Sequence, residues 1–580
     1  MKKNKNASFR ITNVGEVVTL HGWVSKIRNL GGLIFIDLRD RSGIIQVIVN
    51  PDNPYYSLAE TLKNEYVIKV VGKIVERQSK NSNMETGDIE VEVQELELLN
   101  NSIELPFMIQ DDITALEDTR LKYRYLDLRR PELQNKLITR HKITMAIRDY
   151  LDKLDFLEVE TPILCKSTPE GARDYLVPSR LSKGKFYALP QSPQIFKQLL
   201  MVSGVERYFQ IAKCFRDEDL RADRQPEFTQ VDMEMSFVEQ EDVLEIVEGL
   251  LADIFKKVKN IDLKLPLQRM KYDDAMELYG SDKPDLRFDM KIQDISSIFD
   301  NTEFTVFKDV LNNGGIINAL VVKNRANETS RKELDKLTEF VKTYQAKGLA
   351  YLKFNEEVSG SLAKVLSAEE IGSLRNKLNV EDNDLVLIVA DKKKIVKASL
   401  GALRCKLGRE LGLIDPNDYA LLWVVDFPSF EWSEEENRYM ACHHPFTSPL
   451  DSDVDKLLTD KANCYSKAYD IVINGYEAGG GSIRIHDQEV QQKMFEALEL
   501  TEEQIRDKFG FFVDALKYGT PPHGGLALGL DRLVMLLTNT ENIRDVIAFP
   551  KTASASDLMC EAPNIVDEHQ LQELHININK

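Results

Sequence analysis

The chain has 580 residues, which is too long for a single hydrophobic core and predicts three or more domains. With 43% hydrophobic and 29% charged residues it has an ordinary globular composition, and no apolar run approaches the ~20 residues of a membrane helix. The six cysteines are widely spaced without a C-x-x-C pair, which argues against a zinc site or a disulfide framework and favours a reducing, cytoplasmic location.

The net charge of -19 is unfavourable for a nucleic-acid-binding protein, because phosphate contacts need lysine and arginine. Residues 1–50 are an exception, with eight basic side chains against three acidic ones. This local excess fits a solvated N-terminal face as well as an RNA-binding face, so charge alone leaves both interpretations open.

Residues 1–104 are expected to form a small β-barrel. Five segments are rich in β-branched residues and are separated or preceded by turn residues such as Gly31-Gly32. The segments are 17–24, 33–38, 44–49, 66–75 and 89–99. Five strands in about 100 residues are typical of an oligonucleotide-binding (OB) barrel. The alternative is a five-stranded barrel with no role in nucleic-acid binding.

A polar linker at residues 105–135 is expected to join this barrel to a mixed α/β region. Apolar residues recur there at helical spacing, first from Ile143 to Leu154 and again from Val243 to Val258. Residues 288–418 alternate strands and helices without a recognisable chemical motif. We therefore expect an insertion at 288–418 that divides one catalytic domain into residues 136–287 and 419–580.

Residues 209–234 carry the densest chemical signal of the chain. They predict a strand, a long polar loop and a second strand, with Arg216 and Glu218 near one strand end. Phe228 and the polar residues that alternate after it share one face of the second strand. An arginine beside carboxylates and an aromatic ring is suited to hold a triphosphate and stack a purine. A salt-bridged surface hairpin is the alternative.

Three segments, in family order, resemble the motifs of class II aminoacyl-tRNA synthetases. Motif 1, whose proline lies at the dimer interface, resembles Phe156-Leu-Glu-Val-Glu-Thr-Pro162. Motif 2 resembles Phe215-Arg-Asp-Glu followed by Arg224-Gln-Pro-Glu-Phe-Thr-Gln230, and motif 3 resembles the strand–helix segment from Gly525 to Leu537. The class I signatures H-I-G-H and K-M-S-K-S are absent from the sequence. Together the three motifs identify the chain as a member of class II.

Four further segments resemble the bacterial type of the aspartate-specific members of this class. They are 168–175, 191–197, 443–449 and 470–486. The resemblance implies a multidomain α+β fold: an N-terminal OB-fold anticodon-binding barrel, an antiparallel-sheet catalytic domain and an inserted α/β domain. It also implies that L-aspartate is activated with ATP to aspartyl-adenylate and then transferred to the 3′ end of tRNA(Asp) by a cytoplasmic homodimer.

The same resemblance implies the site residues. Arg216 and Arg532 are the expected catalytic cations. The expected aspartate-binding residues are Glu170, Gln194, Lys197, Arg216, Asp232, His443 and Arg484. The expected ATP-binding residues are Arg216, Asp217, Glu218, Gln225, Phe228, Glu477, Gly529, Leu530, Asp531 and Arg532. Asp470 and Glu477 are expected to hold Mg²⁺, which prefers a few carboxylates together with phosphate oxygens.

The barrel carries the residues that the family implies for the anticodon. They are Arg28, Leu30, Phe35, Gln46, Lys80 and Glu90. Alternatively, Phe35 is a residue of the barrel core. Leu30 and Lys80 are the residue types of enzymes that are strict for aspartate tRNA, so we expect discrimination against tRNA(Asn).

Two other functions compete with this interpretation. Synthetases specific for asparagine or lysine share the barrel and the three motifs, but the segment 168–175 and the insertion argue against them. A catalytically inactive, tRNA-binding paralogue is expected to have lost a motif arginine or a metal carboxylate, and Arg216, Arg532, Asp470 and Glu477 are all present. Because every motif lies outside 288–418, we expect a variant without that segment to retain some adenylate formation.

Overall fold

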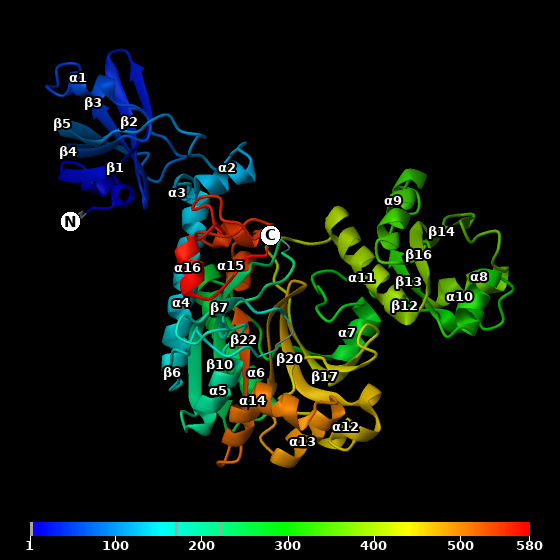
Figure 1. The fold of residues 1–580 in the computed structure, drawn as a ribbon. Coiled ribbons are helices and arrows are strands. Elements are labelled where there is room, and N and C mark those ends of the chain that lie inside the picture. The colour runs from blue at the N-terminus through cyan, green and yellow to red at the C-terminus, as the bar shows by residue number, and fades with distance from the viewer. Residues whose placement is uncertain (1–3, 169–171, 221, 580) are drawn as a thin grey trace. The chain divides into compact units, whose positions relative to one another are not determined.

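The computed structural model describes residues 4–168, 172–220 and 222–579 (Figure 1). The chain forms two compact units. The first comprises Met1–His141, Leu220–Gln225 and Asn542–Asp567, and the second comprises Lys142–Asp219, Pro226–Glu541 and Glu568–Lys580. In the described residues, no helix is both long enough and apolar enough to cross a membrane.

The first unit begins with a closed barrel in the strand order β1-β2-β3-β5-β4. Its strands are β1 (Val17–Leu30), β2 (Leu33–Asp40), β3 (Gly43–Val49), β4 (Val67–Glu76) and β5 (Ile89–Asn100). Gly31 and Gly32 form the turn between β1 and β2 with φ of 63° and 85°, a conformation that glycine adopts without steric cost. The predicted OB-type barrel is confirmed.

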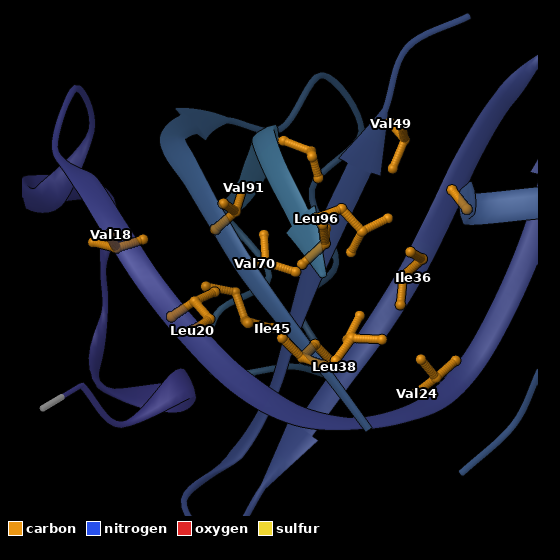
Figure 2. Packing of buried hydrophobic residues seen from close by; sticks show 14 of the residues in the cluster. Val18, Leu20, Val24, Ile36, Leu38, Ile45, Val49, Val70, Val91 and Leu96 are labelled. Carbon is orange, nitrogen blue, oxygen red and sulfur yellow. The ribbon is translucent and has the colours of Figure 1, made fainter. Parts of the chain in front are cut away.

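The first barrel strand is six residues longer than the sequence predicts. β1 pairs with β4 from Val17 to Trp23 and with β2 from Trp23 to Leu30, with a bulge between Val24 and Lys26. Lys26, Arg28 and their polar neighbours interrupt the apolar alternation there, which is why the pattern predicts an early end. The barrel interior is filled by aliphatic side chains, among them Leu20 and Val70, which are fully buried (Figure 2).

The linker after the barrel packs within the first unit. Its short helices are α2 (Glu117–Lys122) and α3 (Arg124–Asp127), and α1 (Tyr56–Thr61) lies between β3 and β4. Arg124 is buried and its guanidinium donates hydrogen bonds to the carbonyl oxygens of Arg544, Ile547 and Ala548 at 2.7–3.0 Å. Charge-assisted bonds to three carbonyls fix the linker to the 542–567 segment, an association that no sequence pattern predicts.

The second unit is built on an eight-stranded sheet in the order β11-β17-β20-β21-β22-β10-β9-β6. All neighbours are antiparallel except the two outer pairs, β11 with β17 and β6 with β9. The strands are β6 (Leu157–Glu158), β9 (Arg207–Phe215), β10 (Glu227–Ser236), β11 (Gln268–Lys271), β17 (Leu421–Pro428), β20 (Tyr465–Ile473), β21 (Tyr476–Ile483) and β22 (His523–Gly529). The predicted hairpin is confirmed as β9 and β10.

Several helices pack against this sheet. They include α4 (Pro131–Asp152), α5 (Gln194–Val202), α6 (Gln240–Lys259), α7 (Tyr272–Tyr279) and α15 (Leu530–Leu537). Helices α4 and α6 confirm the two predicted amphipathic patterns, because Ile147, Val247 and Ile254 are fully buried. The smaller elements are β7 (Leu176–Pro178), β8 (Phe186–Ala188), β18 (Phe430–Ser433), β19 (Arg438–Ala441), α12 (Lys456–Thr459), α13 (Gln488–Ala497), α14 (Glu502–Ala515) and α16 (Glu568–Glu573).

Between α7 and β17 the chain forms a separate antiparallel sheet in the order β12-β13-β16-β14-β15. Its elements are β12 (Gln293–Asp294), α8 (Thr305–Asn312), β13 (Ile316–Val322), α9 (Arg331–Lys342), β14 (Ala350–Phe354), β15 (Ser359–Gly360), α10 (Ala368–Lys377), β16 (Asp384–Asp391) and α11 (Lys393–Glu410). Successive residues of β16 enter two different apolar clusters, one on each face of this sheet: Leu385 and Leu387 one, Val386 and Ile388 the other. The strand is therefore buried on both faces, as its uninterrupted apolar sequence indicates.

Candidate active site

Four charged side chains form a buried cluster on the catalytic sheet. Lys197 of α5 donates from Nζ to Asp232 Oδ1 at 2.6 Å and lies 3.3 Å from Glu234 Oε2. Arg484, directly after β21, binds Glu234 through Nε at 2.9 Å and Nη2 at 3.1 Å. All four side chains are at most 2% exposed. Two cations therefore balance two carboxylates inside the protein, as buried charges require.

The strand register explains why these carboxylates lie together. Asp232 and Glu234 are two residues apart on β10, so both side chains point to the same face of the sheet. Burial opposes charge on Glu234, but Arg484 and Lys197 hold the pKa of its carboxyl below its usual value. Burial raises the pKa of Asp232 against the attraction of Lys197. The sequence analysis placed Glu234 on this face but did not assign it to the site.

Two histidines lie at the Arg484 end of the cluster. The His444 ring Nε2 lies 2.9 Å from Arg484 Nη1, which also donates to Ser482 Oγ at 2.7 Å. Burial and the neighbouring Arg484 lower the pKa of His444 well below its usual value, which favours the neutral ring. Burial lowers the pKa of His443 to about 4. The sequence analysis named His443 but missed His444 and Ser482.

Arg216 and Phe228 face each other across the β9–β10 hairpin. The Arg216 guanidinium lies 5.0 Å from the Phe228 ring centroid, and the Arg216 backbone N–H donates to the Pro226 carbonyl at 2.9 Å. A cation above an aromatic face leaves the other face of the ring available for a planar ligand. Asp217 pairs with Arg173 through its backbone, and Glu218 follows on the same loop.

The strand–helix pair β22–α15 places Arg532 against β21. Arg532 Nη1 donates to the Glu477 carbonyl oxygen at 2.6 Å. Asp531 is buried and accepts the Thr229 backbone N–H at 2.7 Å, which ties the start of α15 to β10. Gly529 and Leu530 form the turn between the strand and the helix. The motif 3 arginine is thus fixed beside the strand that carries Glu477.

Asp470 and Glu477 lie on the neighbouring strands β20 and β21. Burial and the charge of Glu477 raise the pKa of Asp470 well above its usual value. Asp470 pairs in register with Gly480, and a Cβ at Gly480 would lie only 2.3 Å from Asp470 Oδ1. Glycine is therefore needed at this position for the carboxylate to occupy its place. Glu477 is 42% exposed and open to a ligand.

Four of the predicted aspartate-binding residues keep a buried polar atom without a hydrogen-bond partner in the described part of the chain. These atoms are Gln194 Nε2, Arg216 Nε, Asp232 Oδ2 and His443 Nδ1. A buried polar atom without a partner is costly, so each is a place where a ligand would supply the missing bond. Glu170 lies outside the described residues.

Gln225, a predicted ATP-binding residue, is hydrogen-bonded to the protein backbone in the structure. It belongs to the first compact unit, where its amide both donates to the Lys551 carbonyl oxygen at 3.0 Å and accepts from the Lys551 N–H at 2.8 Å. Both ends of the amide are thus bonded to one backbone. A contact between Gln225 and ATP would require the amide to give up these bonds, so this contact stays a prediction.

The barrel presents a polar network around Phe35. Gln46 donates to Glu90 at 2.6 Å and accepts from Arg77 at 2.9 Å, and Arg28 donates to Asp37 at 2.7 Å and lies 3.5 Å from the Gln46 oxygen. Cross-strand pairing explains the grouping, since Arg28 pairs with Phe35, Asp37 with Gln46 and Gln46 with Glu90. The sequence analysis missed Arg77.

Phe35 itself is only partly buried and stands outside the apolar cluster that fills the barrel, so it is not a core residue. Leu30 is 61% exposed at the end of β1. Lys80 is instead paired with Glu76 at 2.9 Å and Asp88 at 3.9 Å. The barrel therefore offers an aromatic ring bordered by amide and charged groups, which is the composition of a surface for single-stranded RNA.

Comparison with known families agrees with this geometry. Residues 116–553 match the family of class II tRNA synthetases for D, K and N, and residues 18–99 match the OB-fold nucleic acid binding domain. The fold also resembles asparaginyl-tRNA synthetase from Pyrococcus horikoshii complexed with asparaginyl-adenylate, with a TM-score of 0.58 at 19% identity over 94% of this chain and 96% of that one. The chain is a class II aminoacyl-tRNA synthetase and has the fold of that class.

Similarity at the level of sequence narrows the family. The aspartate–tRNA ligase of Macrococcus caseolyticus is 56% identical over 571 residues, covering 98% of this chain and 96% of that protein. A protein of Anoxybacillus flavithermus named aspartate–tRNA(Asp/Asn) ligase is 55% identical over 570 residues, covering 97% of this chain and 96% of that one. Within class II, the chain belongs to the aspartate–tRNA ligase family.

Proposed function

We propose that the described site activates L-aspartate with ATP and then transfers it to tRNA(Asp), with the residues in the roles that follow. The observation that carries this proposal is the fully buried pair of cations, Lys197 and Arg484, which share Glu234. A carboxylate side chain that enters beside two cations gains charge-assisted bonds, whereas an amide would set its N–H donors against donors. The pocket therefore selects aspartate over asparagine by charge.

Activation requires positioning rather than a covalent enzyme intermediate. The α-carboxylate of aspartate attacks the α-phosphorus of ATP, the bond to the bridging oxygen breaks, and pyrophosphate leaves with that electron pair. Two anions must meet, so Arg216 is proposed to bridge the carboxylate and the α-phosphate. Phe228 would stack on the adenine opposite the guanidinium, and Arg532 would neutralise the terminal phosphates.

The carboxylates Asp470 and Glu477 fit a magnesium site. Burial of Asp470 and the charge of Glu477 both oppose ionisation of the Asp470 carboxyl, which is why its pKa is raised. A bound cation would stabilise the two carboxylates in their charged form. Clusters of three or more metal-binding side chains do not occur in the described residues, and Mg²⁺ commonly uses one or two carboxylates with substrate phosphates. When bound, Mg²⁺ would neutralise phosphate charge during displacement.

The decisive experiment for the proposed activity is amino-acid-dependent ATP–pyrophosphate exchange with aspartate, asparagine and lysine. We expect exchange with aspartate alone. Exchange with asparagine at a comparable kcat/KM would contradict the charge-based selection by Lys197 and Arg484. No exchange with any of the three would contradict the activity itself.

We also propose that the enzyme charges tRNA(Asp) in preference to tRNA(Asn). Leu30 at the end of β1 and Lys80 after β4 support this, since the family shows these residue types in strict enzymes. The similar proteins include one named aspartate–tRNA ligase and one named aspartate–tRNA(Asp/Asn) ligase, so charging of the two tRNAs must be compared directly. Charging of the two purified tRNAs by one enzyme preparation provides it, and equal kcat/KM values would overturn the strict specificity.

Further proposals concern organisation. The proposed domains are residues 1–104, 105–135, 136–287, 288–418 and 419–580. They are supported by the barrel in the first segment, the eight-stranded sheet that the third and fifth segments share, and the separate sheet in the fourth. A homodimer through motif 1 is supported by exposed apolar residues at the β6 edge of the sheet, Leu157 at 54% and Leu164 at 53% exposed. Sedimentation of a Leu157→Glu variant tests this, and an unchanged molecular mass would exclude the β6 edge as the dimer interface.

A further inference from the structure

A short segment between α7 and β12, residues 280–290, carries a lysine to the metal-binding end of the site. Lys283 Nζ lies 3.9 Å from Glu477 Oε2, and its side chain is 44% exposed. Lys283 is thus a cation beside one of the two proposed magnesium ligands, and it remains open to a ligand.

Helix α11, in the inserted region, contacts α7 and both ends of this segment. At the first end, Gly280 has φ of +65°, and a Cβ there would lie 2.2 Å from the Lys397 carbonyl oxygen. A Cβ at Gly401 would in turn lie 2.8 Å from the Gly280 carbonyl oxygen. Backbones this close leave no space for a side chain, so the segment begins against α11.

At the second end, Arg404 of α11 holds the segment through three carbonyl groups. Its Nε donates to Met290 at 2.7 Å, and its Nη2 donates to Asp285 at 2.8 Å and Phe288 at 2.9 Å. The guanidinium lies 4.0 Å from the Phe288 ring centroid and is only 1% exposed. A buried guanidinium that binds carbonyls at several angles restrains backbone position more than a surface contact does.

The restrained segment also touches the turn between the two strands that carry the magnesium ligands. A Cβ at Gly475, in the β20–β21 turn, would lie 3.1 Å from the Asp285 Cβ. Arg287 donates hydrogen bonds to the Asp285 carboxylate, from Nε at 3.0 Å and from Nη2 at 2.7 Å. The position of Lys283 is therefore set by α11 on one side and by the β20–β21 turn on the other.

We propose that Lys283 binds the pyrophosphate portion of ATP, and that Arg404 is a positioning residue through which the inserted region holds Lys283 in place. This inference rests on the proposed function, because it places the β- and γ-phosphates near Asp470 and Glu477. A lysine ammonium is a compact charge that binds phosphate without a fixed geometry. Lys283 stabilises the leaving pyrophosphate by charge alone.

The proposal changes our expectation for a variant without residues 288–418. All sequence motifs lie outside that segment, but Arg404 and the whole of α11 lie inside it. The deletion would remove residues 288–290 of the segment together with α11, and would leave residues 280–287 without the contacts from Lys397 and Arg404. It is expected to weaken pyrophosphate binding together with adenylate formation, while the aspartate pocket of Lys197 and Arg484 keeps its own contacts.

The primary test is a Lys283→Met variant, which removes a half-exposed charge and retains the aliphatic chain. Calorimetric titration with inorganic pyrophosphate and magnesium should give a dissociation constant about five- to tenfold higher than for the unmodified enzyme. In ATP–pyrophosphate exchange without tRNA, KM for pyrophosphate should rise by the same factor while KM for aspartate stays unchanged. The aspartate control separates a local effect from general loss of structure.

Arg404→Gln tests the positioning role. It should raise KM for pyrophosphate like Lys283→Met, and the double variant should be no worse than either single variant, because the two residues act through one contact. The matched control is Lys397→Met on the same helix. Lys397 donates to the Glu277 carbonyl and carboxylate but not to residues 285–290. It should lower thermal stability without changing pyrophosphate affinity.

Each alternative has a distinct result. The terminal phosphates of tRNA share the chemistry of pyrophosphate; a Lys283→Met enzyme that binds pyrophosphate normally but transfers aspartate slowly would overturn our assignment in favour of tRNA. Additive effects of Arg404→Gln and Lys283→Met would show that Arg404 is merely structural. If the unmodified enzyme gave no aspartate-dependent exchange, the proposed function would fail, while the pyrophosphate titration would still decide the role of Lys283.

Discussion

At the scale of single residues, Arg484 combines a structural and a ligand-binding task. Its guanidinium binds the Glu234 carboxylate through two nitrogens, and its Nη1 contacts His444 and Ser482. The site therefore exists before aspartate arrives, with the charges already balanced within the protein. Such preorganisation avoids reordering the pocket at the moment of binding.

Replacement of Arg484 by leucine should impair aspartate activation. Loss of a charge-assisted bond to the substrate carboxylate corresponds to about 1.5–3 kcal/mol, or roughly 10- to 150-fold in kcat/KM for aspartate. Glu234 would lose its bidentate partner in a buried site, which lowers stability by about 3–5 kcal/mol. Exchange kinetics and thermal unfolding measure the two effects separately.

The control for this variant is ATP binding, which should change much less than aspartate activation. Arg484→Lys keeps the charge but loses the two-pronged geometry, so it should recover stability more than activity. Equal losses in ATP binding and aspartate activation would show that Arg484 is a structural residue and not a specificity residue.

His443 gives the catalytic unit a pH dependence of stability. Its pKa is about 4 in the folded protein because of burial, below the ordinary value of 6.5 that the unfolded chain regains. Between these values the unfolded state binds more protons, so the free energy of unfolding falls as the pH falls from about 7 towards 4. His444 shifts in the same direction.

A His443→Gln variant should therefore lose less stability on acidification than the unmodified enzyme. Thermal unfolding at pH 7 and pH 5 measures the difference between the two proteins. Since His444 still titrates in the variant, part of the slope should persist. Identical pH slopes for both proteins would mean that His443 is solvated and that burial does not depress its pKa.

At the scale of elements, the pairing of β20 with β21 determines the positions of the proposed magnesium ligands Asp470 and Glu477. The run Gly479-Gly480-Gly481 predicts only a loop when read alone, but in the structure it lies within a central strand. Each glycine there meets a different neighbour. A Cβ at Gly480 would contact the Asp470 carboxylate, whereas a Cβ at Gly481 would contact the Gly525 carbonyl oxygen of β22.

Gly480→Ala and Gly481→Ala should therefore have different effects. At Gly480 the new Cβ would displace the Asp470 Oδ1, 2.3 Å away, and a catalytic group misplaced by about 1 Å lowers the rate roughly 100-fold. At Gly481 the Cβ would meet backbone at 2.0 Å, so the sheet itself should lose stability. Exchange rates and unfolding midpoints of both variants check this, and similar profiles would refute the distinction.

At the scale of the whole molecule, the residues we propose for tRNA recognition and those we propose for amino-acid activation belong to separate parts of the chain. The barrel is in the first compact unit and the charge cluster in the second. A stack of one base on one aromatic ring corresponds to about 1–3 kcal/mol, so Phe35→Ala should lower aspartylation of tRNA about ten- to a hundredfold. Exchange without tRNA should be unchanged.

Val17→Ala, an exposed barrel position outside the polar network, is the matched control for Phe35→Ala. It should leave charging unchanged. If both variants charge tRNA normally, the Phe35 face does not bind the anticodon. If Phe35→Ala also slows exchange without tRNA, the barrel and the active site are coupled more closely than we propose.

The sequence alone determined the barrel and the β9–β10 hairpin. Each is a local pattern: β-branched alternation with turn residues, or a charged loop between two strands. The strand–helix pair of motif 3 and the candidate site residues were implied by the resemblance to the family, whose motif residues keep a fixed spacing within one or two neighbouring elements. Arg216, Phe228 and Asp232 all belong to one hairpin and share its geometry.

The tertiary structure alone decided the contacts between distant elements. Glu234 and Arg484 are 250 positions apart, and Arg404 meets the backbone of residues 285–290 from more than 110 positions away. Periodicity describes only which face of an element is apolar, so it cannot show which buried cation meets which carboxylate or carbonyl. Those pairings follow from the requirement that every buried charge has a partner, and this requirement is satisfied only when the whole chain is packed.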